Sequence, residues 1–192
     1  MAPTFIMFFG PPGCGKGTQA KKAIQEFKLA QISTGELFRK HLSENTDLGV
    51  KAKQFMDKGE LVPDDVTIGM VRERLQQPDC ENGAIFDGFP RTGAQAEALD
   101  KLLAETGSKL DMVIDFVLPI EISRDRLLGR QEGRTDDKPE VIEKRLSDHA
   151  AIEASVMPHY EAQEGIVKKI DANRTIDDIY VDVAALITDA MA

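Results

Sequence analysis

Five short and nearly continuous apolar runs are spaced along the chain, and segments with helical periodicity lie between them. The runs cover residues 5–9, 29–32, 84–86, 112–118 and 166–170. Strands that are apolar on both faces and alternate with helices are typical of a parallel sheet covered on both sides. The pattern therefore predicts a three-layer α/β fold around a five-stranded parallel sheet. We expect right-handed crossovers, and ligands bound over the carboxyl ends of the strands.

Two of the helical segments carry an apolar stripe at intervals of three and four residues. The last helix of the chain is the clearest case, with a stripe made of Ile176, Ile179, Val183, Leu186, Ile187 and Ala190. A second stripe follows the first predicted strand and consists of Ala20, Ala23, Ile24 and Phe27. We expect each of these helices to pack one face against the sheet.

Two stretches do not fit the alternation of strands and helices. Residues 33–63 have room for two short helices, with a capping box from Ser33 to Glu36 and a stop at Gly59. Residues 130–138 are polar, acidic and contain glycine. We interpret both as insertions over the ligand edge of a single domain, whose core comprises 1–32, 64–129 and 139–192. Such insertions are often the moving parts of an enzyme.

The stretch 10–18, Gly-Pro-Pro-Gly-Cys-Gly-Lys-Gly-Thr, lies between the first predicted strand and the first predicted helix. Small residues let successive backbone N–H groups point at phosphate oxygens, and the helix behind them adds the positive end of its dipole. Lys16 adds a full charge that can follow the outer phosphates. This context favours a phosphate-binding P-loop over a chance match. One departure is Gly17, which stands where the general motif has Ser or Thr for magnesium, with Thr18 one residue later.

Composition limits the partners that this domain can have. The 192 residues are 42% hydrophobic and 30% charged, as in an ordinary globular domain, and the net charge is −9. A negative net charge argues against non-specific binding of nucleic acid. A polyanionic ligand would therefore need a local concentration of arginine and lysine.

Cysteine and histidine usage points to no metal or redox site. Cys14 and Cys80 are the only cysteines and lie far apart in the sequence, and two thiols in a chain this long suggest a reducing compartment such as the cytoplasm. The histidines, His41, His149 and His159, form no ligand cluster and are interpreted as surface or helix-packing residues.

Targeting signals are not expected either. The N-terminus lacks the basic region of a signal peptide, and the apolar run after it is too short. The longest other apolar run, 112–120, is interrupted by Asp115 and Pro119, so no membrane association is expected.

An acid and an arginine follow the third predicted strand, in the sequence Asp-Gly-Phe-Pro-Arg-Thr at 87–92. Asp87, at the carboxyl end of a strand beside the P-loop strand, is placed to orient magnesium directly or through water. A helix or turn cap is the alternative interpretation of Asp87. Arg91 follows a turn that contains Gly88 and Pro90, and a guanidinium held there can bind a phosphate with two parallel N–H bonds.

Four further arginines surround the second insertion, namely Arg126, Arg130, Arg134 and Arg145. Such a basic row often marks a solvated surface, and acids such as Asp125, Glu132 and Asp136 can neutralise it. The position of the row beyond the strand ends, where the P-loop also lies, favours a functional cluster. The chain has no evident nucleophile with an adjacent base, which fits phosphoryl transfer because positioning and charge neutralisation supply most of that catalysis.

Five motifs occur in order along the chain. They are Gly-x-Pro-Gly-x-Gly-Lys-Gly-Thr at 10–18, Ser-Thr-Gly-Glu-Leu-Phe-Arg at 33–39, Gly-Glu-Leu-Val-Pro-Asp at 59–64, Asp-Gly-Phe-Pro-Arg-Thr at 87–92 with Gln95, and Gly-Arg-x-Glu-Gly-Arg-x-Asp-Asp at 129–137. Together they resemble the adenylate kinases of the short-lid type, within the nucleoside monophosphate kinases. The resemblance extends from Thr4 to Arg174. It implies reversible transfer of the terminal phosphate of Mg-ATP to AMP, giving two ADP, a reaction that serves adenine nucleotide homeostasis.

The resemblance also implies a role for each motif residue. The ATP-binding set would be Gly13, Cys14, Gly15, Lys16, Gly17, Thr18, Arg126, Arg130 and Arg174, the last mainly through its backbone on the adenine side. The AMP-binding set would be Thr34, Arg39, Glu60, Leu61, Val62, Gly88, Phe89, Pro90, Arg91, Gln95, Arg134 and Arg145. The catalytic set would be Lys16, Arg91, Arg126, Arg130, Arg134 and Arg145.

The same resemblance sets expectations for cofactors and assembly. Magnesium would be carried by ATP and oriented through water by Asp87, which accommodates the glycine at position 17. Zinc is not expected, because the short lid contains no cysteine. The insertions at 33–63 and 130–138 would be the AMP-binding segment and the lid, which close to exclude water, and the protein would be a monomer.

Two alternatives remain open from the residues alone. A UMP/CMP kinase would share these motifs, although Thr34 and Gln95 favour adenine because both can hydrogen-bond a purine. A nucleotide-binding regulator that hydrolyses slowly would need the P-loop, but it would not need four arginines around a lid.

Overall fold

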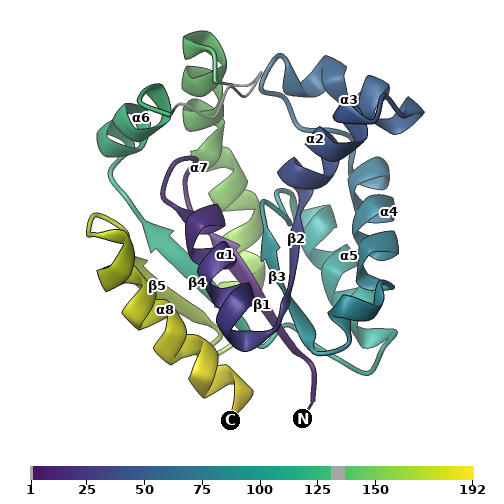
Figure 1. Cartoon of the computed structure of the whole chain (residues 1–192), viewed down its shortest axis with the longest axis vertical. Helices are drawn as coiled ribbons and strands as arrows, with labels where there is room; N and C mark the ends of the chain where they lie inside the picture. The colour runs from purple at the N-terminus through teal and green to yellow at the C-terminus, as the bar shows by residue number, and fades with distance from the viewer. Residues whose placement is uncertain (1, 131–136) are drawn as a thin grey trace.

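A five-stranded parallel sheet forms the centre of the computed structural model, which describes residues 2–130 and 137–192 (Figure 1). The strands are β1 (Thr4–Phe9), β2 (Ala30–Ser33), β3 (Gly83–Asp87), β4 (Met112–Val117) and β5 (Val167–Asp171), in the order β2-β3-β1-β4-β5. Each neighbouring pair is parallel. The predicted fold class and all five predicted strands are therefore confirmed, with ends that differ by one residue.

The two faces of the sheet are buried in separate apolar clusters. All six residues of β1 are buried, because the strand is central and its side chains alternate between the faces. Phe5 and Met7 enter one cluster, and Ile6 and Phe8 enter the other. This explains why the central strands read as continuous apolar runs without alternation.

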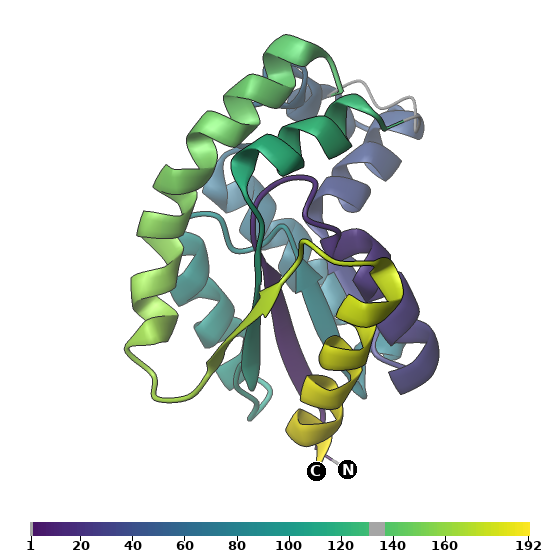
Figure 2. The ribbon, with the colours of Figure 1, turned by 90° about the vertical axis from the view of Figure 1, so that its left-hand side faces the viewer.

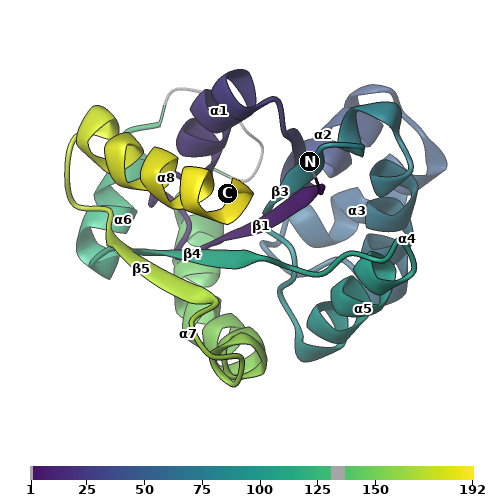
Figure 3. The same cartoon turned by 90° about the horizontal axis from the view of Figure 1, so that it is seen from below.

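Helices cover both faces, as Figure 3 shows. On one face lie α1 (Lys16–Phe27) and α8 (Ile176–Met191). The other face is covered by α4 (Asp64–Leu75), α5 (Gly93–Ala104) and α7 (Pro139–Glu161). The predicted stripes of α1 and α8 face the sheet, except that Ile176 at the start of α8 is 54% exposed.

Strand β5 differs from the expectation of a sheet covered on both sides. It is an edge strand, and its residues Lys168 and Lys169 are exposed. Charged side chains on an edge strand hinder pairing with another chain, so lysines at this position suit an uncovered edge.

The stretch 33–63 contains two helices, as the sequence predicts: α2 (Thr34–Ser43) and α3 (Asp47–Met56). The hydroxyl of Ser33 accepts a hydrogen bond of 3.4 Å from the backbone N–H of Glu36, which is one half of the predicted capping box. Phe38 and Ala52 form the centre of a separate apolar cluster. This segment therefore packs mainly on itself and on the start of α4.

The end of the molecule beyond the carboxyl ends of the strands is completed by α6 (Ile120–Leu128) and α7, which Figure 2 shows meeting above the sheet. Leu127, Ile142 and Leu146 pack between these two helices. A short 3-10 helix, η1 (Pro78–Cys80), precedes β3. Residues 131–136, with the predicted Arg134, lie outside the described residues. Among the helices that the structure describes, none is long and apolar enough to cross a membrane.

Candidate active site

The glycine-rich loop is pressed between the sheet and α6. At Gly10 the backbone has φ +134°, and a Cβ added there would lie 2.5 Å from the carbonyl oxygen of Phe116 on β4. At Gly13, with φ +83°, an added Cβ would lie 2.9 Å from the carbonyl oxygen of Ser123 on α6. A side chain at either position would clash with β4 or α6 and displace the loop, so glycine is required at both positions.

Helix α1 begins directly at Lys16, and Gly15 before it offers no side chain to cap the first turn. The N–H groups of this turn therefore remain suited to bind an anion, with the helix dipole behind them. The Lys16 ammonium group bends back over the loop and donates hydrogen bonds to the carbonyl oxygens of Gly10 (2.8 Å) and Pro11 (2.9 Å). Cys14 is buried beneath the loop with its Sγ 3.4 Å from Lys16 Nζ, so only its backbone is placed to bind phosphate.

A cavity of about 350 Å³ opens above this loop. It is lined by Gly13, Gly15, Lys16, Gly17 and Thr18, by Asp87, Gly88, Phe89 and Pro90 after β3, and by the arginines Arg39, Arg91, Arg126, Arg130 and Arg145. Segments from distant parts of the sequence thus bring arginine side chains to one crevice. This is the concentration of positive charge that an acidic protein needs in order to bind a polyanion.

A second, smaller cavity of about 80 Å³ lies between α2 and the turn that follows α3. Its predicted residues are Thr34, Glu60, Leu61, Val62 and Gln95. The two cavities share Gly35, Arg39, Gly88, Arg91 and Arg145. Three arginines therefore lie where the two cavities meet.

The turn after β3 is held by hydrogen bonds to one carbonyl oxygen. The hydroxyl of Thr34 and the Nε of Arg91 each donate to the carbonyl oxygen of Gly88, both at 2.8 Å. These bonds connect the start of α2 to the arginine that lines both cavities. Thr34 is thereby oriented at the wall of the smaller cavity.

Gln95 is buried and positioned by two partners. Its Oε1 accepts a hydrogen bond from the backbone N–H of Arg91 (2.8 Å), and its Nε2 donates to Asp64 Oδ1 (2.8 Å). The hydroxyl of Thr92 donates to the other oxygen of Asp64. Asp64 ends the motif at 59–64, but sequence reasoning gave it no role, because its place in the first turn of α4 is also that of an ordinary dipole-stabilising acid.

Asp87 lies beside the glycine that departs from the general P-loop motif. A Cβ added to Gly17 would lie 3.7 Å from Asp87 Oδ2, so the carboxylate reaches the first turn of α1. No group of three or more potential metal ligands occurs among the described residues. A single carboxylate beside the loop fits magnesium that is carried by phosphates and takes its other ligands from phosphates and water.

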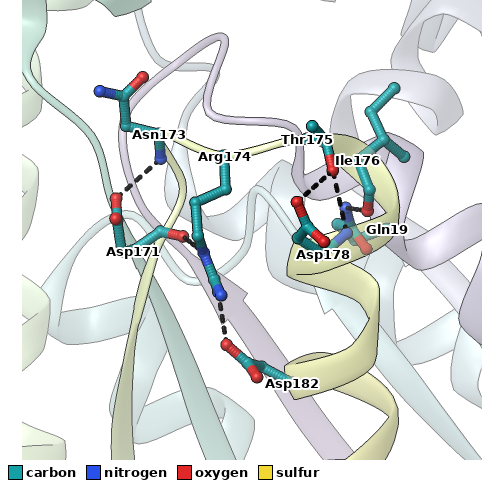
Figure 4. A network of polar contacts seen from close by, with 8 residues as sticks. All are labelled: Gln19, Asp171, Asn173, Arg174, Thr175, Ile176, Asp178 and Asp182. Atoms are coloured by element: carbon teal, nitrogen blue, oxygen red, sulfur yellow. Dashed lines mark hydrogen bonds and ion pairs between the residues drawn. The ribbon is translucent and has the colours of Figure 1, made fainter.

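Two predicted arginines bind carbonyl oxygens at the carboxyl end of β5, but only one of them lines the crevice. Arg126 donates from Nη2 to the carbonyl oxygen of Ala172 at 3.0 Å. Arg174 lines neither cavity: its Nε donates to the carbonyl oxygen of Asp171 at 3.0 Å, and its guanidinium pairs with Asp182 (Figure 4). The side chain of Arg174 therefore holds its own loop against α8.

Arg130 forms a partly buried ion pair with Asp137, with Nη1 and Oδ1 3.3 Å apart. The two residues flank the segment 131–136, and their side chains are only 18% and 12% exposed. The pair therefore joins the end of α6 to the residues before α7.

Comparisons with known proteins identify the family of the chain. A sequence profile of the adenylate kinase family matches residues 8–165. The adenylate kinase of Leuconostoc mesenteroides is 45% identical, over 93% of this chain and 94% of its own length. The adenylate kinase of Shouchella clausii is 39% identical, over 97% of this chain and 99% of its own length. The adenylate kinase of Archaeoglobus fulgidus is 40% identical, over 95% of this chain and 97% of its own length.

The chain belongs to the adenylate kinase family. Adenylate kinases are nucleoside monophosphate kinases that transfer a phosphoryl group between ATP and AMP, bind ATP, AMP and ADP, and generally use Mg²⁺ with ATP. The alignment with the Shouchella clausii adenylate kinase spans 216 residues, which is more than the 192 residues of this chain. That adenylate kinase therefore carries segments that this chain lacks, whereas the alignment with the Leuconostoc mesenteroides enzyme spans 178 residues.

His149 is among the residues of this adenylate kinase crevice that were not predicted to line it. His149 lines the larger cavity, with its ring centroid 5.8 Å from that of Phe9. Burial, Lys16 and Arg91 together lower the pKa of His149 to about 4, so the imidazole is neutral at physiological pH. Its interpretation as a surface or helix-packing residue was therefore incomplete. The signal was its spacing: His149 lies four residues after Arg145, on the same face of α7.

Proposed function

We propose that the chain transfers the terminal phosphoryl group of Mg-ATP to AMP at the junction of its two cavities, reversibly giving two ADP. The observation that carries this proposal is that Arg39, Arg91 and Arg145 line both cavities. Two nucleotides that meet end to end place several negative charges at one point. Guanidinium groups at that point offset the repulsion and the charge that spreads over the transferred group.

The donor nucleotide would occupy the larger cavity. Backbone N–H groups from Gly13 to Thr18 would bind its phosphates, supported by the uncapped start of α1. The Lys16 ammonium group would exchange loop carbonyl oxygens for phosphate oxygens, which requires only a rotation of its flexible side chain. Magnesium would neutralise the phosphates when bound, and Asp87 would orient it through water.

The acceptor nucleotide would occupy the smaller cavity, with its phosphate toward the shared arginines. Thr34 and Gln95 line this cavity and carry groups that can hydrogen-bond a purine. Glu60, Leu61 and Val62 form another part of its wall, and their backbone would contact AMP. Arg91 would hold the acceptor phosphate in line for attack, because Gly88 and Gln95 fix its backbone and guanidinium.

The insertions would form the moving parts of this mechanism. Residues 33–63 would be the AMP-binding segment and residues 130–138 the lid, with Arg134 approaching the phosphates on closure. Helices α2 and α3 pack around an apolar cluster that is separate from the two clusters of the sheet and shared with α4, which supports a segment that moves as a unit on α4. Closure would exclude water from the terminal phosphate, which limits wasteful hydrolysis.

The remaining expectations follow from composition and from the position of the site. A monomer remains the expectation that the resemblance to the short-lid adenylate kinases implies. Two free cysteines, both buried, support a reducing compartment such as the cytoplasm. The net charge of −9 supports nucleotides, and not nucleic acid or membrane surfaces, as partners. Zinc is not part of the proposed mechanism.

An acceptor panel tests the proposal. Purified protein is given ATP and Mg²⁺ with AMP, UMP, CMP or no acceptor, and the nucleotides are separated and quantified over time. We expect rapid formation of ADP with AMP, rates at least about tenfold lower with UMP and CMP, and slow ATP loss without acceptor. Rapid turnover of UMP without turnover of AMP would indicate a pyrimidine enzyme. ATP binding without transfer to any monophosphate would indicate a nucleotide-dependent regulator.

A further inference from the structure

The direction of the donor nucleotide follows from the order of the strands. The P-loop follows β1 in the middle of the sheet, and the smaller cavity lies beyond β2 and β3 on one side. Parallel strands present all their carboxyl ends at one edge. A donor whose terminal phosphate points toward the smaller cavity must therefore extend the other way, toward the ends of β4 and β5.

The segment 172–175 connects β5 to α8 on that side, and several side chains fix its path (Figure 4). Arg126, which lines the crevice, donates to the carbonyl oxygen of Ala172. Arg174 ties the segment to Asp182 on α8, and the backbone N–H of Asn173 donates to Asp171 Oδ1 at 2.8 Å. We call residues 172–175 the β5–α8 loop.

Gln19 connects this loop to the phosphate-binding helix. It lies three residues after Lys16 on α1, and it is 1% exposed. Its Nε2 donates a hydrogen bond of 2.9 Å to the carbonyl oxygen of Ile176, the first residue of α8. A carbonyl oxygen can only accept, so the amide nitrogen must face Ile176. The amide oxygen has no hydrogen-bond partner among the described residues.

A half-satisfied buried amide is a costly way to stabilise a core. An apolar side chain of the same length would fill this place without burying an unpaired oxygen. The hydrogen bond to Ile176 joins two segments 157 residues apart in sequence, one at the start of α1 and one at the start of α8. Farther along the two helices the Lys22–Asp177 ion pair and the Tyr180–Glu26 hydrogen bond also join α1 to α8, so the Gln19 bond is the contact between them that lies nearest the P-loop and the β5–α8 loop.

We propose that Gln19 is a positioning residue that sets the distance between the phosphate site and the base site of the donor nucleotide. The proposal rests on the proposed function for the direction in which the donor lies. A donor nucleotide that binds through both its phosphates and its base gains affinity from the base only if the distance between the two sites matches the length of the nucleotide. The Gln19 hydrogen bond therefore supports selection of a nucleoside triphosphate over a triphosphate that has no base.

Binding of ATP and of inorganic tripolyphosphate separates the two sites. Dissociation constants of both anions are measured by calorimetry with Mg²⁺ for the wild type, for Gln19→Met and for Gln25→Met. Methionine keeps the length and helix propensity of glutamine but cannot donate the hydrogen bond. Gln25→Met is the matched control, because Gln25 is an exposed residue of the same helix.

We expect Gln19→Met to weaken ATP binding on the order of tenfold, while tripolyphosphate binding changes by less than about twofold. Gln25→Met should bind both anions as the wild type does. Equal weakening of the two anions in Gln19→Met would overturn the proposal, because Gln19 would then support only the phosphate loop. A wild type that binds the two anions equally would overturn it as well. If Gln19→Met does not fold, Gln19→Asn, which draws the amide back by one methylene, must show the same selective loss.

The outcome is distinguishable from failure of the proposed function. Selective loss of ATP binding in a protein that does not phosphorylate AMP would keep the positioning role and remove the kinase assignment. Unchanged selectivity in a protein that converts AMP rapidly would do the reverse. Turnover gives a further readout: Gln19→Met should raise KM for ATP and leave KM for AMP unchanged.

Discussion

Lys16 is the residue whose charge the proposed mechanism needs most. Its ammonium group contacts only backbone oxygens and the Cys14 sulfur among the described residues, so it supports no buried ion pair. We expect Lys16→Met to lower kcat with ATP and AMP by at least about 100-fold, because charge on the transferred group loses its nearest cation. The loss in free energy of unfolding should be only about 1 kcal/mol.

Steady-state kinetics and urea unfolding check this prediction. Lys101→Met, at an exposed position of α5, is the control and should leave both quantities unchanged. Wild-type kcat in Lys16→Met would mean that the phosphates bind elsewhere.

His149 gives the crevice a pH-dependent effect on stability. The pKa of this imidazole is lowered to about 4 in the folded protein, whereas the unfolded chain has the ordinary value of 6.5. Between these values the unfolded state binds a proton that the folded state does not, so the wild type loses stability as pH falls from about 6.5 toward 4. Asp148 also lines the crevice, but the positive charges of Lys16 and Arg91 oppose protonation.

His149→Phe removes this proton and keeps a ring beside Phe9. We expect the variant to lose less stability than the wild type between pH 7.5 and pH 5, by on the order of 1 kcal/mol after allowance for solvent screening. Urea unfolding at the two pH values measures the difference, and the pH 7.5 pair gives the baseline because the imidazole is then neutral in both states. A difference between the proteins that is the same at both pH values would contradict the assignment.

Residues within local motifs were predictable, whereas partners from distant segments were not. The glycine-rich stretch indicated Lys16 because the motif specifies backbone conformation over a few consecutive residues. The hydrogen bond between Gln95 and Asp64 depends on how α4 and α5 pack, which no local pattern encodes. The ion pair of Arg174 with Asp182 likewise depends on how the β5–α8 loop lies against α8, which no local pattern encodes.

At the level of elements, the support of the P-loop by α6 can be tested at Gly13. Gly13→Ala would place a methyl group 2.9 Å from the carbonyl oxygen of Ser123, at a backbone angle of φ +83°. We expect a loss of about 1–3 kcal/mol in the free energy of unfolding and a large loss of kcat, because the loop must shift.

Gly69→Ala is the matched control on α4. It has ordinary helical backbone, and an added Cβ would contact nothing within 4 Å. Because alanine favours helix over glycine, this variant should gain about 0.5–1 kcal/mol with unchanged kcat. Urea unfolding of both variants measures the contrast. Equal effects of the two substitutions would show that α6 does not support the loop.

The elements themselves were predictable because their signals are local and repeated. The apolar runs specified the five strands, and the stripes specified α1 and α8. The pair Lys168 and Lys169 within β5 was compatible with an edge strand, but the sequence did not show which strand β5 lies beside. Strand order depends on the topology of the whole chain, so an apolar run by itself does not show which strands lie beside it.

The whole molecule combines a negative net charge with a positive crevice, and salt should act on these two features in opposite directions. The charge of −9 repels itself across the surface, so screening by salt should stabilise the fold. The crevice attracts nucleotides through Arg39, Arg91, Arg126, Arg130 and Arg145, so the same screening should weaken binding. Potassium chloride is the salt to use, because sulfate or phosphate would compete for the anion site.

Raising potassium chloride from about 50 to about 500 mM shortens the Debye length from roughly 14 to roughly 4 Å. Over this range we expect KM for AMP to rise about threefold or more, while Tm rises by at least about 1 °C. Both quantities are measured on the same preparation, so loss of folded protein cannot imitate weaker binding. If Tm and nucleotide affinity fell together, the arginines would be stabilising the fold and would not form a phosphate-binding site. Opposite signs would show that one acidic surface and one basic crevice act as separate electrostatic units in the same chain.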